Sequence, residues 1–175
     1  METTPIRKLP VGIQDFTSLR EDGYLYVDKT ALVYKMVTTG KPYFLSRPRR
    51  FGKSLLISTL EAYFLGRKDL FKGLAIEQLE KDWKVYPVLH LSLNAQFYEN
   101  KRSLEQVLDA HFIQWEKKYG ETDKEVGYSA RFMQIIQQAC EKTGEKVVVL
   151  IDEYDKPLLQ AINNCLLYTS PSPRD

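Results

Sequence analysis

Two short stretches of the sequence contain residue types that could bind a nucleotide phosphate and activate water. The first is the tripeptide GKS at 52–54, inside FLSRPRRFGKSLLIS (44–58). The second is the run VVVLIDE (147–153), which ends in Asp152 and Glu153. A lysine and a hydroxyl suit phosphate oxygens and magnesium, and adjacent acids at a strand end suit a metal shell and an attacking water. Together they predict a nucleotide site.

The first stretch matches only the end of the phosphate-loop signature G-x-x-x-x-G-K-[ST], because Arg47 stands where that signature opens with glycine. GK[ST] alone should occur by chance in roughly one chain in ten of this length. An expected strand before it and an expected helix after it strengthen the match. Gly52 would let the backbone approach the phosphates, Lys53 would reach the β- and γ-phosphates, and Ser54 would ligate magnesium. The expected nucleotide-binding residues are Arg47, Pro48, Arg49, Arg50, Phe51, Gly52, Lys53, Ser54 and Leu55.

In the second stretch, Asp152 is the expected magnesium ligand beside Ser54, and Glu153 is the residue expected to polarise water. Glu153 and Lys53 are therefore the expected catalytic residues. The acids could instead be an ordinary polar strand end, and the basic residues before Ser54 could be a solvated patch. Two motifs that occur in the required order, each on the required kind of element, weigh against both simpler interpretations.

Apolar spacing, caps and turn residues predict the elements that must position these side chains. The expected helices cover 29–38 (capped by Asp28), 53–65, 103–119 and 128–142, and the expected strands cover 43–46, 87–93 and 147–151. Residues 1–27 and 66–86 are expected to be irregular or linking segments. A wholly aliphatic run such as VVVLI is typical of a strand covered on both faces of a parallel sheet. The order of elements therefore predicts an α/β fold.

The overall composition argues against several other classes of protein. The chain has 175 residues, of which 43% are hydrophobic, and a formal net charge of +2. This length is enough for about one domain. The balanced charge gives no overall positive potential that would attract nucleic acid. Its start does not resemble a secretory signal, and no apolar run could cross a bilayer. Cys140 and Cys165 give neither a metal-site spacing nor a disulfide framework, so a cytoplasmic location is expected.

The last residues of the chain, CLLYTSPSPRD (165–175), resemble the translation of a sequencing-library adapter. We therefore expect this tail to be non-native and the natural chain to continue beyond Asn164.

The rest of the sequence resembles a bacterial AAA-ATPase-like family in three longer stretches: LPVGIQDFTSLREDGYLYVDKTALV, FLSRPRRFGKSLLISTLEAYFLGRKDLFKGL and VVVLIDEYDKPLL. By this resemblance RPRRFGKS is the family's own nucleotide loop (Walker A) and LIDEYDKP its acidic strand (Walker B). The resemblance implies a P-loop NTPase three-layer sandwich with a mainly parallel sheet, truncated here after the acidic strand. The expected parts are an N-terminal extension that packs on the ATPase domain (1–42), a partial P-loop ATPase domain (43–164) and the non-native tail (165–175).

The same resemblance implies that the chain binds ATP and magnesium and that a longer prokaryotic protein hydrolyses ATP. Family members usually continue into a PD-(D/E)XK nuclease-like domain, through which the longer protein would contact nucleic acid. The resemblance also allows a homo-oligomer of the longer protein. Two alternatives remain: a nucleotide-gated binding module without appreciable hydrolysis, and a basic nucleic-acid-binding module. We expect negligible hydrolysis from the 175-residue chain alone, because the strand that normally joins 43–46 to 147–151 would lie beyond Asn164.

Overall fold

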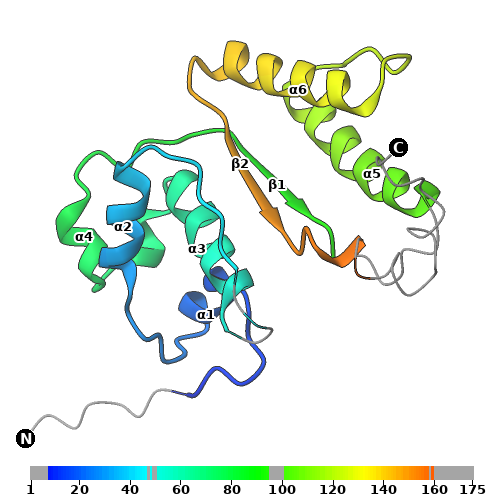
Figure 1. Cartoon of the computed structure of the whole chain (residues 1–175). Helices are drawn as coiled ribbons and strands as arrows, with labels where there is room; N and C mark the ends of the chain where they lie inside the picture. The colour runs from blue at the N-terminus through cyan, green and yellow to red at the C-terminus, as the bar shows by residue number, and fades with distance from the viewer. Residues whose placement is uncertain (1–7, 47, 49–50, 95–100, 158, 160–175) are drawn as a thin grey trace, which may run out of the picture. The chain divides into compact units, whose positions relative to one another are not determined.

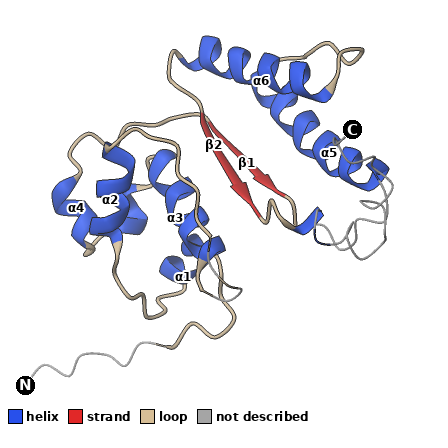
Figure 2. Ribbon diagram, in the orientation of Figure 1, coloured by secondary structure: helices blue, strands red, loops and turns tan. Residues whose placement is uncertain are grey.

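The structure is a computed structural model that describes residues 8–46, 48, 51–94, 101–157 and 159. The chain divides into two compact units, Met1–Tyr86 and Pro87–Asp175. The described part of the first unit contains helices, and that of the second combines helices with a parallel sheet (Figure 1). Figure 2 shows the same chain with helices and strands coloured separately.

The first unit is a small helical unit with an aromatic core. Its elements are α1 (Phe16–Glu21), α2 (Thr30–Thr38), α3 (Lys53–Phe64), the 3-10 helix η1 (Lys68–Phe71) and α4 (Ala75–Leu79). Helix α1 packs on α3, and α2 packs on α4. Phe16 and Phe71 are fully buried with ring centroids 4.9 Å apart, and Trp83 lies 5.1 Å from Phe71. Each buried phenylalanine contributes about 1.5–3 kcal/mol of hydrophobic stabilisation, which holds these short helices together.

Asp28 connects the starts of α2 and α4. Its Oδ1 accepts hydrogen bonds from the Thr30 backbone N–H (2.8 Å) and hydroxyl (2.6 Å), and its Oδ2 accepts one from the Ala75 N–H (2.7 Å). The Thr30 oxygen in turn accepts from the Ile76 N–H at 3.1 Å. Burial raises the pKa of Asp28, but the hydrogen bonds from Thr30 and Ala75 outweigh it and bring the pKa below its usual value. Helix α2 starts at Thr30 with Lys29 at its N-cap position, so Asp28 lies one residue before the cap and is not the expected N-cap. Its side chain nevertheless binds the first N–H of α2 and connects α4 to that helix.

Helix α3 ends in a Schellman motif at Gly66. The Gly66 N–H donates to the Tyr63 carbonyl at 3.0 Å, and the Arg67 N–H donates to the Ala62 carbonyl at 3.0 Å. Gly66 has φ +69°, and a Cβ there would lie 2.7 Å from Val85 Cγ2. Both the left-handed backbone and the close approach require glycine.

The second unit places two helices against a parallel two-stranded sheet. Strand β1 (Val88–Ser92) pairs with β2 (Val148–Asp152), from Val88 opposite Val148 to Ser92 opposite Asp152. Helices α5 (Lys101–Tyr119) and α6 (Tyr128–Thr143) lie between the strands in sequence and pack on each other, providing the crossover that parallel pairing requires. The core joins both helices to β1: Leu89, Leu91, Leu93, Phe112, Trp115, Tyr119, Ile135 and Ala139.

Strand β2 forms an open edge of the described sheet. The Val148 N–H and the Asp152 carbonyl both bond on the β1 side. Because backbone groups alternate sides along a strand, those of Val149 and Ile151 point away from β1. The two residues are 38% and 45% exposed. This edge is therefore both apolar and unpaired among the described residues.

Some expected elements are wrong. Residues 43–46 form no strand: the described sheet contains only β1 and β2, and Tyr43 and Phe44 are 56% and 72% exposed. An apolar run becomes a strand only where another strand pairs with its backbone groups, and no described strand does so here. The helix expected over 103–119 starts two residues earlier, at Lys101, so Ser103 lies inside α5 and does not cap it. Helices α1, η1 and α4 occupy segments expected to be irregular or linking. The α/β class and the parallel pairing are confirmed.

Candidate functional site

The GKS tripeptide lies at the start of α3. Gly52 precedes the helix in the left-handed conformation (φ +75°, ψ +24°), and Lys53 is the first helical residue. A Cβ added at Gly52 would meet nothing within 4 Å, so the backbone conformation, and not space, favours glycine here. The N-cap residue is glycine, so it supplies no side-chain cap to this end of the helix. The N–H groups of the first turn, Lys53 to Leu55, therefore have no intrahelical acceptor and can bind an anion.

The residues before Gly52 are only partly described. Pro48 and Phe51 are exposed, and Phe51 is 63% exposed, whereas Lys53, Ser54 and Leu55 are half-buried. Arg47, Arg49 and Arg50 lie outside the described residues, so their expected contacts with phosphate remain predictions.

Asp152 and Glu153 lie at the carboxyl end of β2, where the side chains of parallel α/β sheets commonly meet ligands. The Asp152 carbonyl accepts the Leu93 N–H at 3.0 Å, which fixes the strand end against β1. Asp152 Oδ1 accepts the Glu153 N–H at 2.9 Å, and among the described residues no hydrogen bond to Oδ2 is seen. Both acids are half-buried. This half of the candidate site is therefore ordered by its own hydrogen bonds.

Glu153 has an uncommon backbone. Its φ is +56°, in the left-handed region that residues other than glycine rarely adopt. The turn continues with the Lys156 N–H donating to the Glu153 carbonyl at 3.0 Å. A conformation of this kind costs of order 1–3 kcal/mol and is found disproportionately at functional sites. No feature of the sequence signals it, because glutamate has no preference for this region.

Three other polar side chains at this end of the sheet were not predicted as part of the site: Asn94, His111 and Lys156. Lys156 Nζ donates to Asn94 Oδ1 at 2.6 Å. His111 Nε2 lies 3.2 Å from the Ser92 carbonyl oxygen. Asn94 directly follows the expected strand, so its position at a carboxyl end was a usable signal.

The two halves of the candidate site belong to different units. Residues 52–55 lie in the first unit, and Asp152 and Glu153 lie in the second. Within each unit, the expected residues that are described lie together at the end of one element.

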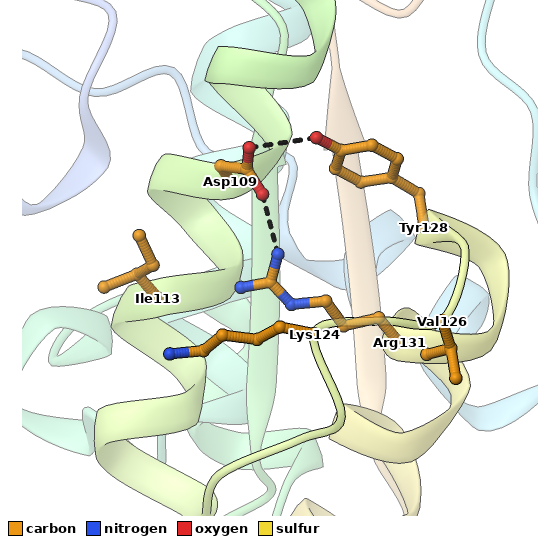
Figure 3. A pocket seen from close by; sticks show the side chains of 6 residues that line it. All are labelled: Asp109, Ile113, Lys124, Val126, Tyr128 and Arg131. Carbon is orange, nitrogen blue, oxygen red and sulfur yellow. Dashed lines mark hydrogen bonds and ion pairs between the residues drawn. The ribbon is translucent and has the colours of Figure 1, made fainter.

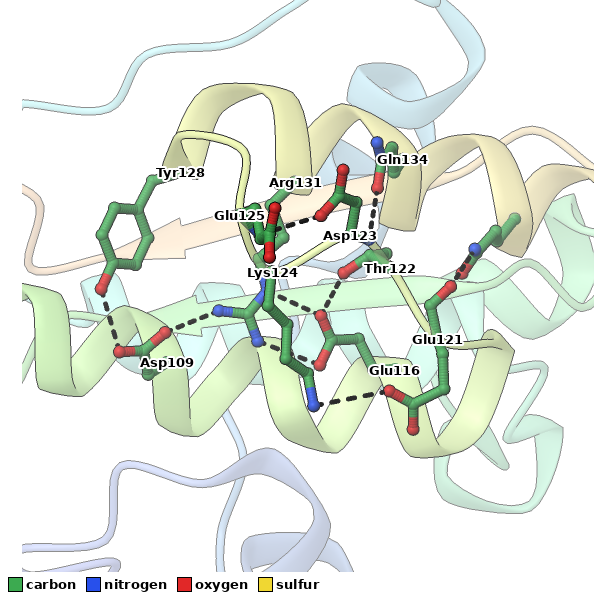
Figure 4. Close-up of polar contacts among 11 residues, drawn as sticks. Asp109, Glu116, Glu121, Thr122, Asp123, Lys124, Glu125, Tyr128, Arg131 and Gln134 are labelled. Atoms are coloured by element: carbon green, nitrogen blue, oxygen red, sulfur yellow. Dashed lines mark hydrogen bonds and ion pairs between the residues drawn. The ribbon is translucent and has the colours of Figure 1, made fainter.

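A separate polar cluster joins α5 to α6. Arg131 Nε and Nη2 donate to the two carboxylate oxygens of Glu116 at 2.7 and 3.0 Å, and Nη1 donates to Asp109 Oδ1 at 2.6 Å (Figure 4). The Tyr128 hydroxyl donates to Asp109 Oδ2 at 2.9 Å, and that of Thr122 donates to Glu116. Hydrogen bonds from Arg131 hold the pKa of Glu116 below its usual value. Arg131 and Glu116 are nearly inaccessible to solvent.

The pocket beside this cluster does not suit a phosphate. It is lined by Asp109, Ile113, Lys124, Val126, Tyr128 and Arg131 (Figure 3). All three nitrogens of the Arg131 guanidinium already bond carboxylates, and the negative charge of Glu116 and Asp109 offsets the charge that would attract an anion. The cluster therefore acts as a structural clip between the helices, and the strand and helix ends remain the candidate site.

The parallel α/β pairing is compatible with an AAA-like fold, and a comparison with known families identifies the class of protein. The chain belongs to the family described as predicted AAA-ATPase, whose model matches residues 10–171. It is 43% identical over 155 residues to a protein of Azotobacter chroococcum mcd 1 named "Uncharacterized protein in vnfD 5'region". That alignment covers 87% of this chain but 30% of the relative, so the chain spans about a third of the relative's length. No solved structure matches the chain. None of the described helices is both long and apolar enough to span a membrane.

Proposed function

We propose that this chain is the nucleotide-binding part of a magnesium-dependent ATPase. The observation that carries the proposal is the start of α3, where left-handed Gly52 leads directly into Lys53 and, as a glycine, supplies no side-chain cap to the first-turn N–H groups. These donors and the positive end of the helix dipole suit a phosphate group. The family description supports ATP as the nucleotide.

In this proposal Lys53 binds the β- and γ-phosphates of ATP. Arg47, Arg49 and Arg50 add side-chain cations where the usual loop would offer backbone donors, since charge-assisted hydrogen bonds from arginine to phosphate are strong. Pro48, Phe51 and Leu55 complete the loop around these residues.

The donor set suits magnesium. Magnesium in nucleotide sites keeps several waters and takes one or two protein ligands in addition to phosphate oxygens. The Ser54 hydroxyl and the Asp152 carboxylate, whose Oδ1 accepts the Glu153 N–H, are the proposed protein ligands of that kind. Among the described residues no cluster of three or more His, Cys, Asp or Glu side chains could hold a metal, so phosphate oxygens would complete the shell. When bound, magnesium neutralises charge on the phosphates.

Glu153 is the proposed base. As the oxygen of a water attacks the γ-phosphorus and the bond to ADP breaks, the Glu153 carboxylate accepts the proton that the water loses. A carboxylate on a turn fixed by hydrogen bonds on both sides is pre-organised for this role.

The finer structural predictions also remain proposals. We propose a three-layer P-loop sandwich in which a further strand pairs with the open edge of β2, because Val149 and Ile151 present unpaired backbone groups and apolar side chains there. The same proposal includes domain boundaries at 42/43 and 164/165 and a cytoplasmic location. For a longer protein it also includes a homo-oligomer and a nucleic-acid partner.

Binding is tested by Lys53→Ala in the full-length protein, measured by calorimetry with ATP and magnesium. We expect the variant to lose measurable affinity, because the main phosphate cation is gone. Lys81→Ala is the matched control, since Lys81 is an exposed lysine of the same unit. Unchanged ATP affinity in Lys53→Ala would remove this residue from the site and favour the basic nucleic-acid-binding alternative.

Hydrolysis is tested by Glu153→Gln, with Asp152→Asn as a companion. Glu153→Gln should bind ATP normally and lose turnover, because an amide cannot accept the proton from water. Asp152→Asn should weaken the magnesium-dependent part of ATP binding. Full turnover in Glu153→Gln would exclude it as the base. ATP binding without turnover in the parent protein would establish the nucleotide-gated module instead.

A further inference from the structure

A side-chain contact ties the turn after β2 to the segment that follows β1. Lys156 Nζ donates to Asn94 Oδ1 at 2.6 Å, across 62 residues of sequence. Asn94 directly follows Leu93, whose backbone N–H donates to the Asp152 carbonyl at 3.0 Å. The two contacts connect the end of the β1 segment to residues on both sides of Glu153, one before it and one after it.

Glu153 itself needs such support. Its left-handed φ of +56° is unfavourable for a residue with a Cβ. Such a conformation persists only where several surrounding contacts hold it in place. Two local hydrogen bonds help: the Glu153 N–H donates to Asp152 Oδ1, and the Lys156 N–H donates to the Glu153 carbonyl. Both lie within the turn, so neither fixes the turn against the neighbouring strand. The Lys156 side chain does so through Asn94.

We propose that Lys156 and Asn94 are a positioning pair that holds the Glu153 turn in its left-handed conformation. We do not propose that either residue contacts the reacting atoms. The pair acts through Glu153, because loss of the tether would let the 152–154 peptide groups relax and would turn the carboxylate away from its present direction. The catalytic consequence rests on the proposed role of Glu153 as the base, whereas the conformational effect does not.

The contact between Lys156 and Asn94 depends on the position of a hydrogen-bond donor and not on the pairing of two charges. The acceptor is a neutral amide, so the contact is a hydrogen bond from a cation and not an ion pair. Arginine at position 156 also carries donors at the end of a long side chain and could keep the contact. Methionine has a similar length and no donor, so it removes the hydrogen bond while keeping the apolar stem.

Hydrogen exchange of the full-length protein tests the proposal directly. Lys156→Met and Asn94→Ala should each speed exchange of the Glu153 and Lys156 amides by roughly 3- to 10-fold, the factor expected from losing one hydrogen bond. The double variant should add little to either single change, and Lys156→Arg should restore slow exchange. Lys146→Met is the matched control, because Lys146 is exposed and lies before β2 at the opposite end. Unchanged exchange in Lys156→Met and in Asn94→Ala would overturn the proposal.

Steady-state kinetics tests the catalytic consequence separately. Lys156→Met should lower kcat by roughly 3- to 10-fold and leave the KM for ATP unchanged, with Lys156→Arg close to the parent. Faster amide exchange with an unchanged kcat would overturn the link to catalysis. A parent protein that binds ATP without turnover would overturn the role of Glu153 as base, and the exchange data would still decide whether the pair holds the turn.

Discussion

Glu153 has an acidic side chain and a left-handed backbone conformation, which residues with a Cβ rarely adopt. At the scale of the single residue, this combination indicates that position 153 is not optimised for stability. Natural proteins accept such strain where a side chain must point in one direction for function. The neighbouring Asp152 has ordinary strand geometry, so the strain is specific to the proposed base.

The conformation predicts that Glu153→Gly stabilises the second unit while abolishing hydrolysis. Glycine adopts the left-handed region freely, so the free energy of unfolding should rise by about 1 kcal/mol. Urea denaturation followed by circular dichroism measures the change. The same substitution at Glu141, near the end of α6, should lower stability by up to ~1 kcal/mol. A fall in stability for Glu153→Gly would show that the native turn is not strained.

At the scale of the element, the second unit depends on the clip that joins α5 to α6. Glu116 and Arg131 are both buried and bonded to each other through two hydrogen bonds, and Asp109 and Tyr128 extend the contact toward solvent. Buried charges of this kind add little net stability over an apolar pair, but removing one partner leaves the other uncompensated. Their value lies in fixing how the two helices pack.

Arg131→Met should therefore destabilise the second unit by about 3 kcal/mol, because it leaves the Glu116 carboxylate buried without its cation. The double variant Arg131→Met with Glu116→Leu should recover most of that loss. Chemical denaturation of the four proteins in the cycle measures both effects. A double variant no more stable than Arg131→Met would show that the packing around the clip, not the charge balance, sets the cost.

The clip also predicts the pH dependence of the second unit. Hydrogen bonds from Arg131 lower the pKa of Glu116 in the folded state, so Glu116 contributes stability that is fully present above its ordinary pKa of about 4.3. That contribution is lost as the pH falls through the lowered folded-state pKa. Glu116→Gln should flatten the acid limb of the stability curve, measured as urea midpoints across pH. An acid limb of unchanged slope would contradict the assignment.

The elements show which parts of the fold were predictable from sequence. Helix α3 was predictable because apolar residues recur along it and Gly66 ends it, and β2 because its aliphatic run is long. Helices α1, η1 and α4 were not, because segments of four to six residues are too short to show a helical period. The strand expected at 43–46 was wrong, since an apolar run does not reveal whether a partner strand is present. At the site, the motifs predicted residue types, but the Glu153 backbone and the Lys156 contact arise from tertiary structure.

At the scale of the whole molecule, each unit contains one half of the proposed nucleotide site. The proposed phosphate-binding residues 52–55 lie in the first unit, and the two acids lie in the second. A ligand that requires both halves must couple the stabilities of the units, because it binds only when both are folded.

We therefore expect ATP with magnesium to protect both units of the full-length protein from hydrogen exchange. At a ligand concentration of 100 Kd the stabilisation should be about 2.7 kcal/mol. Protection should extend over α3 and over the turn after β2. In Asp152→Asn the protection of the turn should weaken while that of α3 persists. Protection confined to α3 in the parent protein, with magnesium present, would show that the acids do not belong to the nucleotide site.

The placement of the two tryptophans gives the molecule a pair of built-in optical reporters. The chain has two tryptophans: Trp83 contacts the aromatic core of the first unit, and Trp115 lies in the core of the second. The Trp83 indole N–H is buried and has no acceptor among the described residues. Trp83→Phe therefore removes no hydrogen bond to those residues. Fluorescence of that variant would come from Trp115 alone, and Trp115→Phe would isolate Trp83. The melting of each unit could then be followed separately by emission wavelength, without any added dye.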